Sequence, residues 1–300
     1  MTRMRVAIGI AGLCAVALVA AYCGQDTKFS ARAEHRADEH RRAIQAEIES
    51  LGTHSWAGEY YEGDGLGVGV SLALAPQAGY VFEWHGCMGV YDRNFGGVSV
   101  VDGKLQLSFT FANVREGFQG ISSEFIPVSW GSRVYLIPPN DMVKFCNSVN
   151  AGFEPRNDVH GRHLLRRGDE KKPVAGFPSV PDAYAQYLQE RPITSEIIAT
   201  GAAKLRPSVA NWKFKDTPVT IKGGKDIGLR RGMELHVTSP DHELQSVQIT
   251  EVKERTSEGV VAEIGEESPG PSVGLKLSTL PRWAPHPPNK EPAATNATGH

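Results

Sequence analysis

His85 and Cys87 stand two positions apart in the stretch FEWHGCMGVYD (82–92), and this pair is the first feature that could do chemistry. On a β-strand, residues at this spacing share a face, so the imidazole could act as the base for a thiol nucleophile. The sequence shows no third group to orient the imidazole and none of the cysteine-protease signatures. We therefore expect no catalytic residue here, and a cell-envelope hydrolase using His85 and Cys87 is kept as an alternative.

A cell-envelope hydrolase could instead use carboxylates near Glu59 as its catalytic groups. Glu59, Glu62 and Asp64 lie close together and could pair as acid and base for sugar hydrolysis. Carboxylates beside a glycine turn are usually solvated, so we expect no catalysis from them. Ser71 in GVSLA imitates a nucleophile elbow, but the second glycine is missing and the surrounding alternation predicts an ordinary strand serine.

Metal and cofactor signals are weak throughout the chain. His160 and His163 in HGRH, and His35 with His40, lack the Glu or Cys partners of known metal sites. The glycines of GDGLGVG and GGK do not have the spacing of a phosphate loop or a dinucleotide-binding turn. We expect neither a metal nor a cofactor.

The first 25 residues have the parts of an export signal. Arg3 and Arg5 precede an uncharged apolar run, residues 6–23, with small residues near its end. We expect export to the periplasm or cell envelope, with cleavage after Ala21 favoured over retention of the run as a membrane anchor. Lipidation of Cys23 is a lesser alternative, because a bulky Tyr22 precedes it.

Export determines how the cysteines are interpreted. With Cys14 and Cys23 in the signal, Cys87 and Cys146 are the only pair left for the folded part. Exported proteins meet oxidising conditions. The sequence therefore predicts a Cys87–Cys146 disulfide.

Composition and patterning favour β structure. The chain has 32 glycines, and alternation such as KLQLSFTF recurs between turn signals such as Asp102-Gly103. We predict a mainly β protein with minor α, in which an antiparallel, barrel-like meander and a small C-terminal β-barrel are joined by a helical or irregular connection. The net charge of −2 argues against a nucleic-acid partner.

The predicted organisation has six parts. They are a signal peptide or membrane anchor (1–25), an amphipathic helix (26–52), a barrel-like domain with a capping helix (53–153), a basic linker with a short helix (154–211), a small β-barrel (212–280) and a disordered Pro-rich tail (281–300). The membrane is expected as a partner only through the first segment, if it stays uncleaved.

Aromatic side chains concentrate in the first β domain, where they form either its core or the wall of a ligand cavity. The candidate cavity-lining residues are Trp56, Tyr60, Tyr80, Phe82, Trp84, His85 and Tyr91.

Two resemblances accompany these patterns. The stretch WAGEYYEGDGLGVGVSLALAPQAGYVFEWHGCMGVYD resembles exported bacterial proteins of unassigned function with lipocalin-like sheets, and GGKDIGLRRGMEL resembles a turn in small barrels of envelope and flagellar assembly proteins. They imply barrels and carry no catalytic residue. We expect a non-enzymatic envelope protein that binds a small apolar ligand or scaffolds an envelope partner. A membrane-anchored assembly factor is a further alternative.

Overall fold

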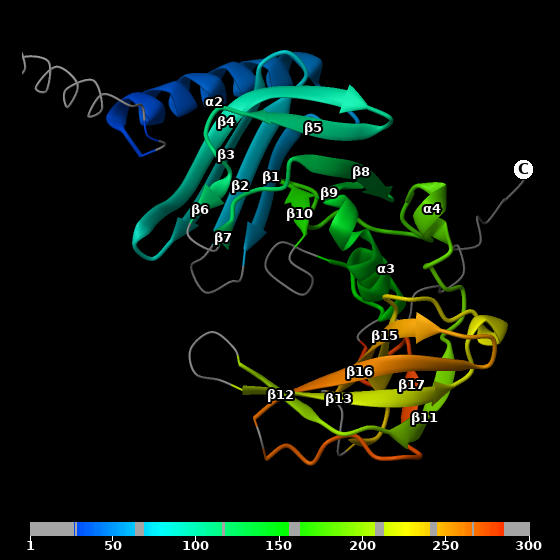
Figure 1. The fold of residues 1–300 in the computed structure, drawn as a ribbon. Coiled ribbons are helices and arrows are strands. Elements are labelled where there is room, and N and C mark those ends of the chain that lie inside the picture. The colour runs from blue at the N-terminus through cyan, green and yellow to red at the C-terminus, as the bar shows by residue number, and fades with distance from the viewer. Residues whose placement is uncertain are drawn as a thin grey trace, which may run out of the picture.

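Two closed β-barrels make up the molecule, which confirms the predicted fold class (Figure 1). The computed structural model describes residues 27, 29–63, 69–115, 118–155, 163–207, 213–240, 245–265 and 267–284. The predicted signal segment, residues 1–25, therefore lies outside the described residues, and the tail is described only to Ala284.

The first barrel has eight antiparallel strands in the order β1-β10-β9-β8-β5-β4-β3-β2. Their bounds are β1 Gly58–Gly63, β2 Gly69–Ala75, β3 Gly79–Gly86, β4 Gly89–Val101, β5 Lys104–Phe109, β8 Glu124–Trp130, β9 Arg133–Ile137 and β10 Leu164–Arg166; β6 Val114–Arg115 and β7 Phe118–Gln119 form a separate ribbon. Pairing of Tyr60 with Arg166 joins β1 to β10 and closes the barrel.

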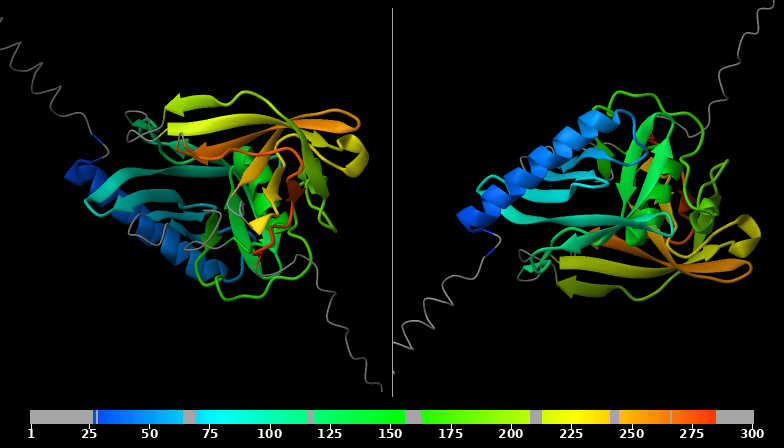
Figure 2. Two further views of the ribbon diagram at one scale, coloured as in Figure 1. Left: turned by 90° about the horizontal axis from the view of Figure 1, so that it is seen from below. Right: turned by 90° about the horizontal axis from the view of Figure 1, so that it is seen from above.

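Helix α2 (Ala31–Leu51) lies across the outer face of β2, β3 and β4 (Figure 2). It begins at Ser30, whose Oγ accepts a hydrogen bond from the backbone N–H of Ala33 at 3.1 Å, and ends at Gly52. Its narrow apolar stripe, including Ala37 and Ile44, is buried against a cluster from the barrel wall that contains Phe95. This narrow stripe of mostly small side chains can hold α2 on the barrel because the outer face of the barrel supplies the large side chains of the interface.

A second helix, α3 (Met142–Asn150), follows the 3-10 turn η1 (Pro139–Asp141) and packs on the outer face of β8, β9 and β10. Phe145, at the centre of this interface, is fully buried and its ring centroid lies 5.3 Å from that of Tyr135. Every residue of β9 is buried, because the barrel core covers one side of the strand and α3 covers the other.

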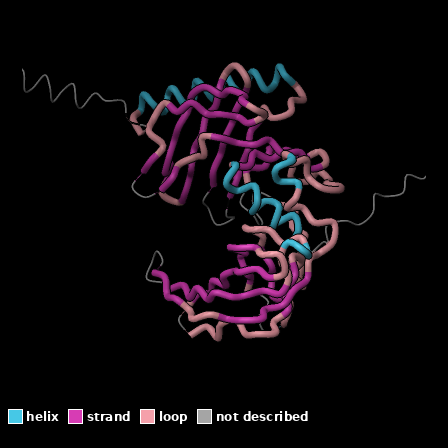
Figure 3. The backbone as a smooth tube through the Cα atoms, turned by 45° about the vertical axis from the view of Figure 1, so that its right-hand side comes forward, coloured by secondary structure: helices cyan, strands magenta, loops and turns pink. Residues whose placement is uncertain are grey.

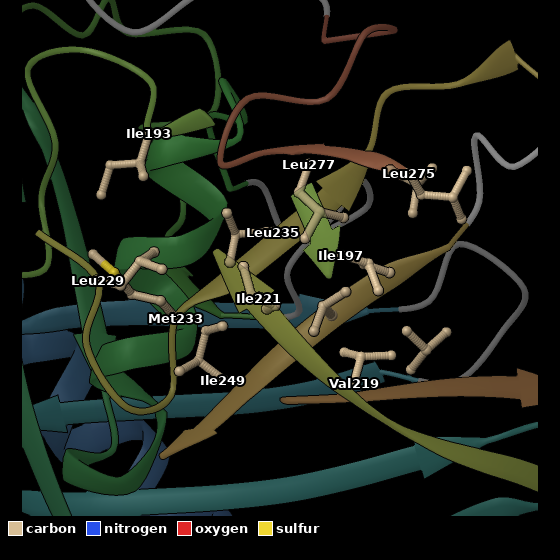
Figure 4. Close-up of a cluster of buried hydrophobic side chains, with 13 residues drawn as sticks. Ile193, Ile197, Val219, Ile221, Leu229, Met233, Leu235, Ile249, Leu275 and Leu277 are labelled. Carbon is tan, nitrogen blue, oxygen red and sulfur yellow. The ribbon is translucent and has the colours of Figure 1, made fainter. Parts of the chain in front are cut away.

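The second barrel closes from six strands in the order β11-β17-β14-β15-β16-β13, with β12 at an edge beside β13. Their bounds are β11 Thr194–Thr200, β12 Lys204–Pro207, β13 Lys213–Lys222, β14 Glu234–Val237, β15 Ser246–Val252, β16 Thr256–Ile264 and β17 Lys276–Ser278; α4 (Asp182–Ala185) precedes them and η3 (Lys225–Ile227) follows β13. Its core is purely aliphatic apart from Met233 (Figure 4). β11 and β12 fall inside the segment predicted as a linker, because β11 has a bulge after Ile197 and lacks clean alternation.

The glycine-rich turn after β13 holds the second barrel together locally. A side chain at Gly224 would place its Cβ 2.0 Å from the carbonyl oxygen of Lys253, so only glycine fits this approach to the β15–β16 hairpin. The chain continues from this turn to Gly232, which contacts α3 of the first barrel. The stretch GGKDIGLRRGMEL therefore includes part of the contact between the two barrels.

Helix α3 is the junction between the barrels (Figure 3). Asn147 donates through Nδ2 to the carbonyl of Gly232 at 2.9 Å and accepts through Oδ1 from the backbone N–H of Glu234 at 3.3 Å. At the helix end, Asn150 donates to the carbonyl of Tyr187 at 2.7 Å and so ties down the linker. One short helix thus contacts the first barrel, the linker and the second barrel.

The longest described helix, α2, is strongly polar. Within the described ranges, no helix is long and apolar enough to cross a membrane. The described start of the tail folds back, since the ring of Trp283 lies 5.2 Å from that of Phe153.

Candidate ligand-binding site

The interior of the first barrel is closely packed at one end of strand β3 and open at the other. Tyr80, Phe82 and Trp84 alternate along the strand and face inward, as the period of two requires: Tyr80 and Phe82 belong to the buried core cluster, and Trp84 packs against it. Tyr80 is fully buried, whereas Trp84 is half-buried where the strand leaves the core. The barrel is therefore filled around Tyr80 and opens toward Trp84.

Aromatic packing fills the closed end. The hydroxyl of Tyr60 donates to the carbonyl of Trp56 at 2.8 Å, and the ring of Tyr80 meets that of Phe109 edge-on at 6.2 Å. Burial raises the pKa of the Tyr60 and Tyr80 hydroxyls well above their usual range. Tyr60 and Tyr80 are thus part of the core, Trp56 packs against it, and none of the three lines the cavity at the open end.

A cavity of about 480 Å³ occupies the open end. Its apolar wall includes Phe82, Trp84, Phe125, Leu136 and Leu164, and its ionisable side chains are Glu62, Asp141, Lys144 and His163. Outside the wall, the ring of Tyr91 contacts Trp84 edge-on at 5.7 Å, beside a β-bulge between Trp84 and His85. Of the seven predicted lining residues, the cavity therefore contains Phe82 and Trp84, and Tyr91 supports the second of them.

The cavity combines the size, shape and aromatic lining of a small-molecule site at the mouth of a barrel. Comparison of the chain with protein-family models, curated proteins and solved structures finds no match. Any function must therefore follow from the geometry of the chain's own residues.

A second cavity adjoins the first. It measures about 730 Å³, lies between α3 and the outer face of the second barrel, and is lined by polar side chains such as Asn140, Gln248 and Thr250. Asn140, Asp141 and Lys144 line both cavities. The apolar mouth of the first barrel thus continues into a polar cleft between the barrels.

A third hollow, of about 610 Å³, lies at one end of the second barrel. Two of its cations already share a carboxylate, since Glu196 pairs with Lys276 and lies 3.7 Å from the ammonium of Lys222. This hollow lacks the aromatic wall of the first cavity. The barrel mouth is the stronger candidate.

His85 points away from the cavity, on the outer face of the barrel. Its Nε2 lies 3.2 Å from Oε2 of Glu83. The same Oε2 accepts a hydrogen bond from Arg41 of α2 at 2.6 Å, and Oε1 accepts one from Arg93 at 2.7 Å. We call Glu83, Arg41, Arg93 and His85 the Glu83 network. It anchors α2 to the barrel and leaves His85 without a direct contact to Cys87 among the described hydrogen bonds.

The predicted disulfide between Cys87 and Cys146 was wrong, since both thiols are free. Cys146 lies on α3 behind β9, whereas Cys87 is exposed just after β3, on the opposite side of the eight-strand ring. A disulfide needs Cα atoms within about 7 Å. The predicted bridge requires α3 to cap the sheet near Cys87, but α3 packs on the outer face of β8–β10 and so keeps Cys146 away from Cys87.

We expect the two thiols to react very differently with a maleimide in the native protein. Cys87 is exposed and should be alkylated within minutes, whereas burial raises the pKa of the Cys146 thiol to about 12 and should protect it until the protein unfolds. Mass mapping of the labelled peptides, with Cys87→Ser as control, gives the result. Protection of both thiols in native protein, lifted by a reductant without unfolding, would show a disulfide instead.

The other residues considered for hydrolysis are also held in structural contacts. Glu59 lies 3.5 Å from Arg167, and Ser71 donates to the carbonyl of Glu83 at 3.4 Å. Asp64 and His160 lie outside the described residues. Within the part of the chain that the structure describes, no three His, Cys, Asp or Glu side chains are grouped to hold a metal ion.

Sequence reasoning missed Phe125, Leu136 and the position of His163 in the cavity wall. β8 alternates poorly around Pro127, and β9 is apolar on both faces, so neither strand reveals which residues point inward. His163 was considered only as a metal ligand. The signal that could have placed His163 in the barrel wall was its position directly before the two apolar residues Leu164 and Leu165, which are both buried.

Proposed function

We propose that the protein is a non-enzymatic binding protein that holds a small apolar ligand in the mouth of its first barrel. The observation that carries the proposal is the cavity of about 480 Å³, walled by Phe82, Trp84 and Phe125, at the open end of a closed barrel. Ligand pockets in proteins commonly measure about 300–1,000 Å³ and have mostly apolar walls. The opposite end is packed solid, so a ligand would enter and leave through the mouth.

The polar cleft next to the mouth supports this role. A ligand bound against Trp84 would have its outer end near Asn140, Asp141 and Lys144, which also line the cleft between the barrels. The second barrel could therefore sense or complete the bound state. The proposal also includes export to the cell envelope, on the strength of the predicted signal in residues 1–25.

Titration with N-phenyl-1-naphthylamine, an uncharged apolar dye whose fluorescence rises in apolar surroundings, tests the proposal. We expect saturable binding of one dye per chain. Trp84→Ala should weaken it by about tenfold or more, because an aromatic wall contributes about 1.4 kcal/mol or more to binding an aromatic ligand. Trp283→Ala is the matched control, since this partly exposed tryptophan lies outside the cavity.

Equal dye affinity in the two variants, or no saturable binding in the wild type, would count against the mouth as a ligand site. Circular dichroism of both variants separates loss of binding from loss of folding.

A further inference from the structure

His163 is a buried polar group in the wall of the mouth cavity. The residue is 3% exposed, and its ring packs against Phe145, with centroids 5.3 Å apart. Its Nε2 is buried and has no hydrogen-bond partner among the residues that the structure describes. Buried polar atoms are almost always paired, so an unpaired imidazole nitrogen beside a cavity calls for a partner that enters the cavity.

The imidazole is uncharged at neutral pH. Burial, with a smaller contribution from the charge of Lys144, lowers the pKa of His163 to about 3. Phe145 presents an apolar ring to it, and Glu62 and Asp141 are the other ionisable groups among the described residues of the cavity wall. An uncharged imidazole nitrogen can either donate or accept one hydrogen bond, depending on its tautomer.

We propose that the ligand is an uncharged, ring-containing alcohol or phenol whose hydroxyl hydrogen-bonds to Nε2 of His163 while its ring packs against Phe82 and Trp84. This inference rests on the proposed ligand site and adds the chemical class of the ligand. A hydroxyl suits this position because it both donates and accepts, so it pairs with either tautomer.

An anionic ligand fits the same wall less well. The neutral imidazole offers no positive charge, and Lys144, the one cation among the described wall residues, is accompanied by the carboxylates Glu62 and Asp141. Placing a carboxylate against the apolar wall would also cost its hydration without a buried counter-charge. The site should therefore discriminate between a hydroxyl and a carboxylate on the same ring.

Displacement of N-phenyl-1-naphthylamine by three naphthalene compounds tests this chemistry on the full chain. We expect 1-naphthol to bind about tenfold more tightly than naphthalene, as one net hydrogen bond allows, and 1-naphthoate to bind more weakly than 1-naphthol. His163→Phe fills the same space without Nε2, so the preference for 1-naphthol should vanish while naphthalene affinity persists. His35→Phe, at an exposed site on α2, should keep the preference.

A second measurement does not depend on the variant folding. In ¹⁵N-histidine-labelled wild-type protein, His163 should be recognised as an imidazole that does not titrate between pH 5 and 8, and its Nε2 resonance should shift on addition of 1-naphthol. An unchanged resonance, an unchanged preference in His163→Phe or strongest binding of 1-naphthoate would overturn the inference and leave the ligand site standing. Absence of dye binding would overturn both.

Discussion

Replacement of Glu83 by alanine should lower the free energy of unfolding by about 3–5 kcal/mol, the usual cost of breaking a buried ion pair from one side. Glu83 and Arg93 are both 6% exposed, and Glu83 accepts the hydrogen bond of Arg93 at 2.7 Å. Without the carboxylate, the guanidinium stays buried with its main counter-charge gone. Arg41 loses its 2.6 Å contact as well, so α2 should detach first.

Urea unfolding measures the loss, and hydrogen exchange of the α2 amides locates it. Glu124→Ala is the matched control, because Glu124 makes an exposed ion pair with Lys104 and such pairs contribute less than about 1 kcal/mol. A Glu83→Ala effect no larger than that of the control would mean that the Glu83 network does not hold the helix.

The same residue predicts an acid response. Burial alone would raise the pKa of Glu83, but the hydrogen bond from Arg93 and the charges of Arg41, Arg93 and His85 outweigh it and hold the pKa below the usual 4.5. The stabilisation is therefore complete above pH 4.5 and is lost as the pH falls through the folded-state pKa. Glu83→Gln should lack this part of the acid sensitivity, whereas the contribution of His163 is common to both proteins.

Phe145→Ala should be equally damaging, with a loss of about 3–5 kcal/mol, as is usual for a fully buried phenylalanine. Its ring fills the space between α3 and β8–β10 and contacts Trp130, Tyr135 and His163. The substitution also loosens the helix that bears Asn147, so faster hydrogen exchange should extend to the turn at Gly232 in the second barrel.

Ser148→Ala on the same helix is the control, because its hydroxyl bonds only to the carbonyl of Lys144 in the preceding turn. Urea unfolding and hydrogen exchange give both readouts. A loss below about 1 kcal/mol for Phe145→Ala would show that α3 contributes little to the first barrel.

Local patterns were enough to predict two β domains and most of the strands in the first. KLQLSF (104–109) became β5 with Leu105 and Leu107 inward, as a period of two requires. The pattern is weaker where a strand is buried on both faces, as in β9, or interrupted by a bulge, as in β11. For these strands, the inward-facing residues are decided by the strands that pair with them and not by their own alternation.

The candidate site was less predictable for a different reason. Alternation on β3 separates Tyr80, Phe82 and Trp84 from His85, but it does not tell which end of the barrel is filled and which is open. That distinction depends on partners far along the chain, including Phe125 and His163. The disulfide prediction failed for the same reason, because the face of the barrel that receives α3 is a property of the closed ring.

The closure of the first barrel by β1 and β10 also sets an order of events during synthesis. Tyr60 cannot meet Arg166 until the ribosome has released β10, so the sheet must wait with two open edges, at β1 and at β9. Chains fold from the N-terminus as they emerge, and an open sheet edge invites pairing with other chains. Helix α2 is released before β2–β4, and these strands follow soon afterwards, so α2 can already cover their outer face during this interval. The nascent chain is therefore most vulnerable to aggregation before β10 emerges, and truncations ending before Leu164 should be far less soluble than those ending after Arg167.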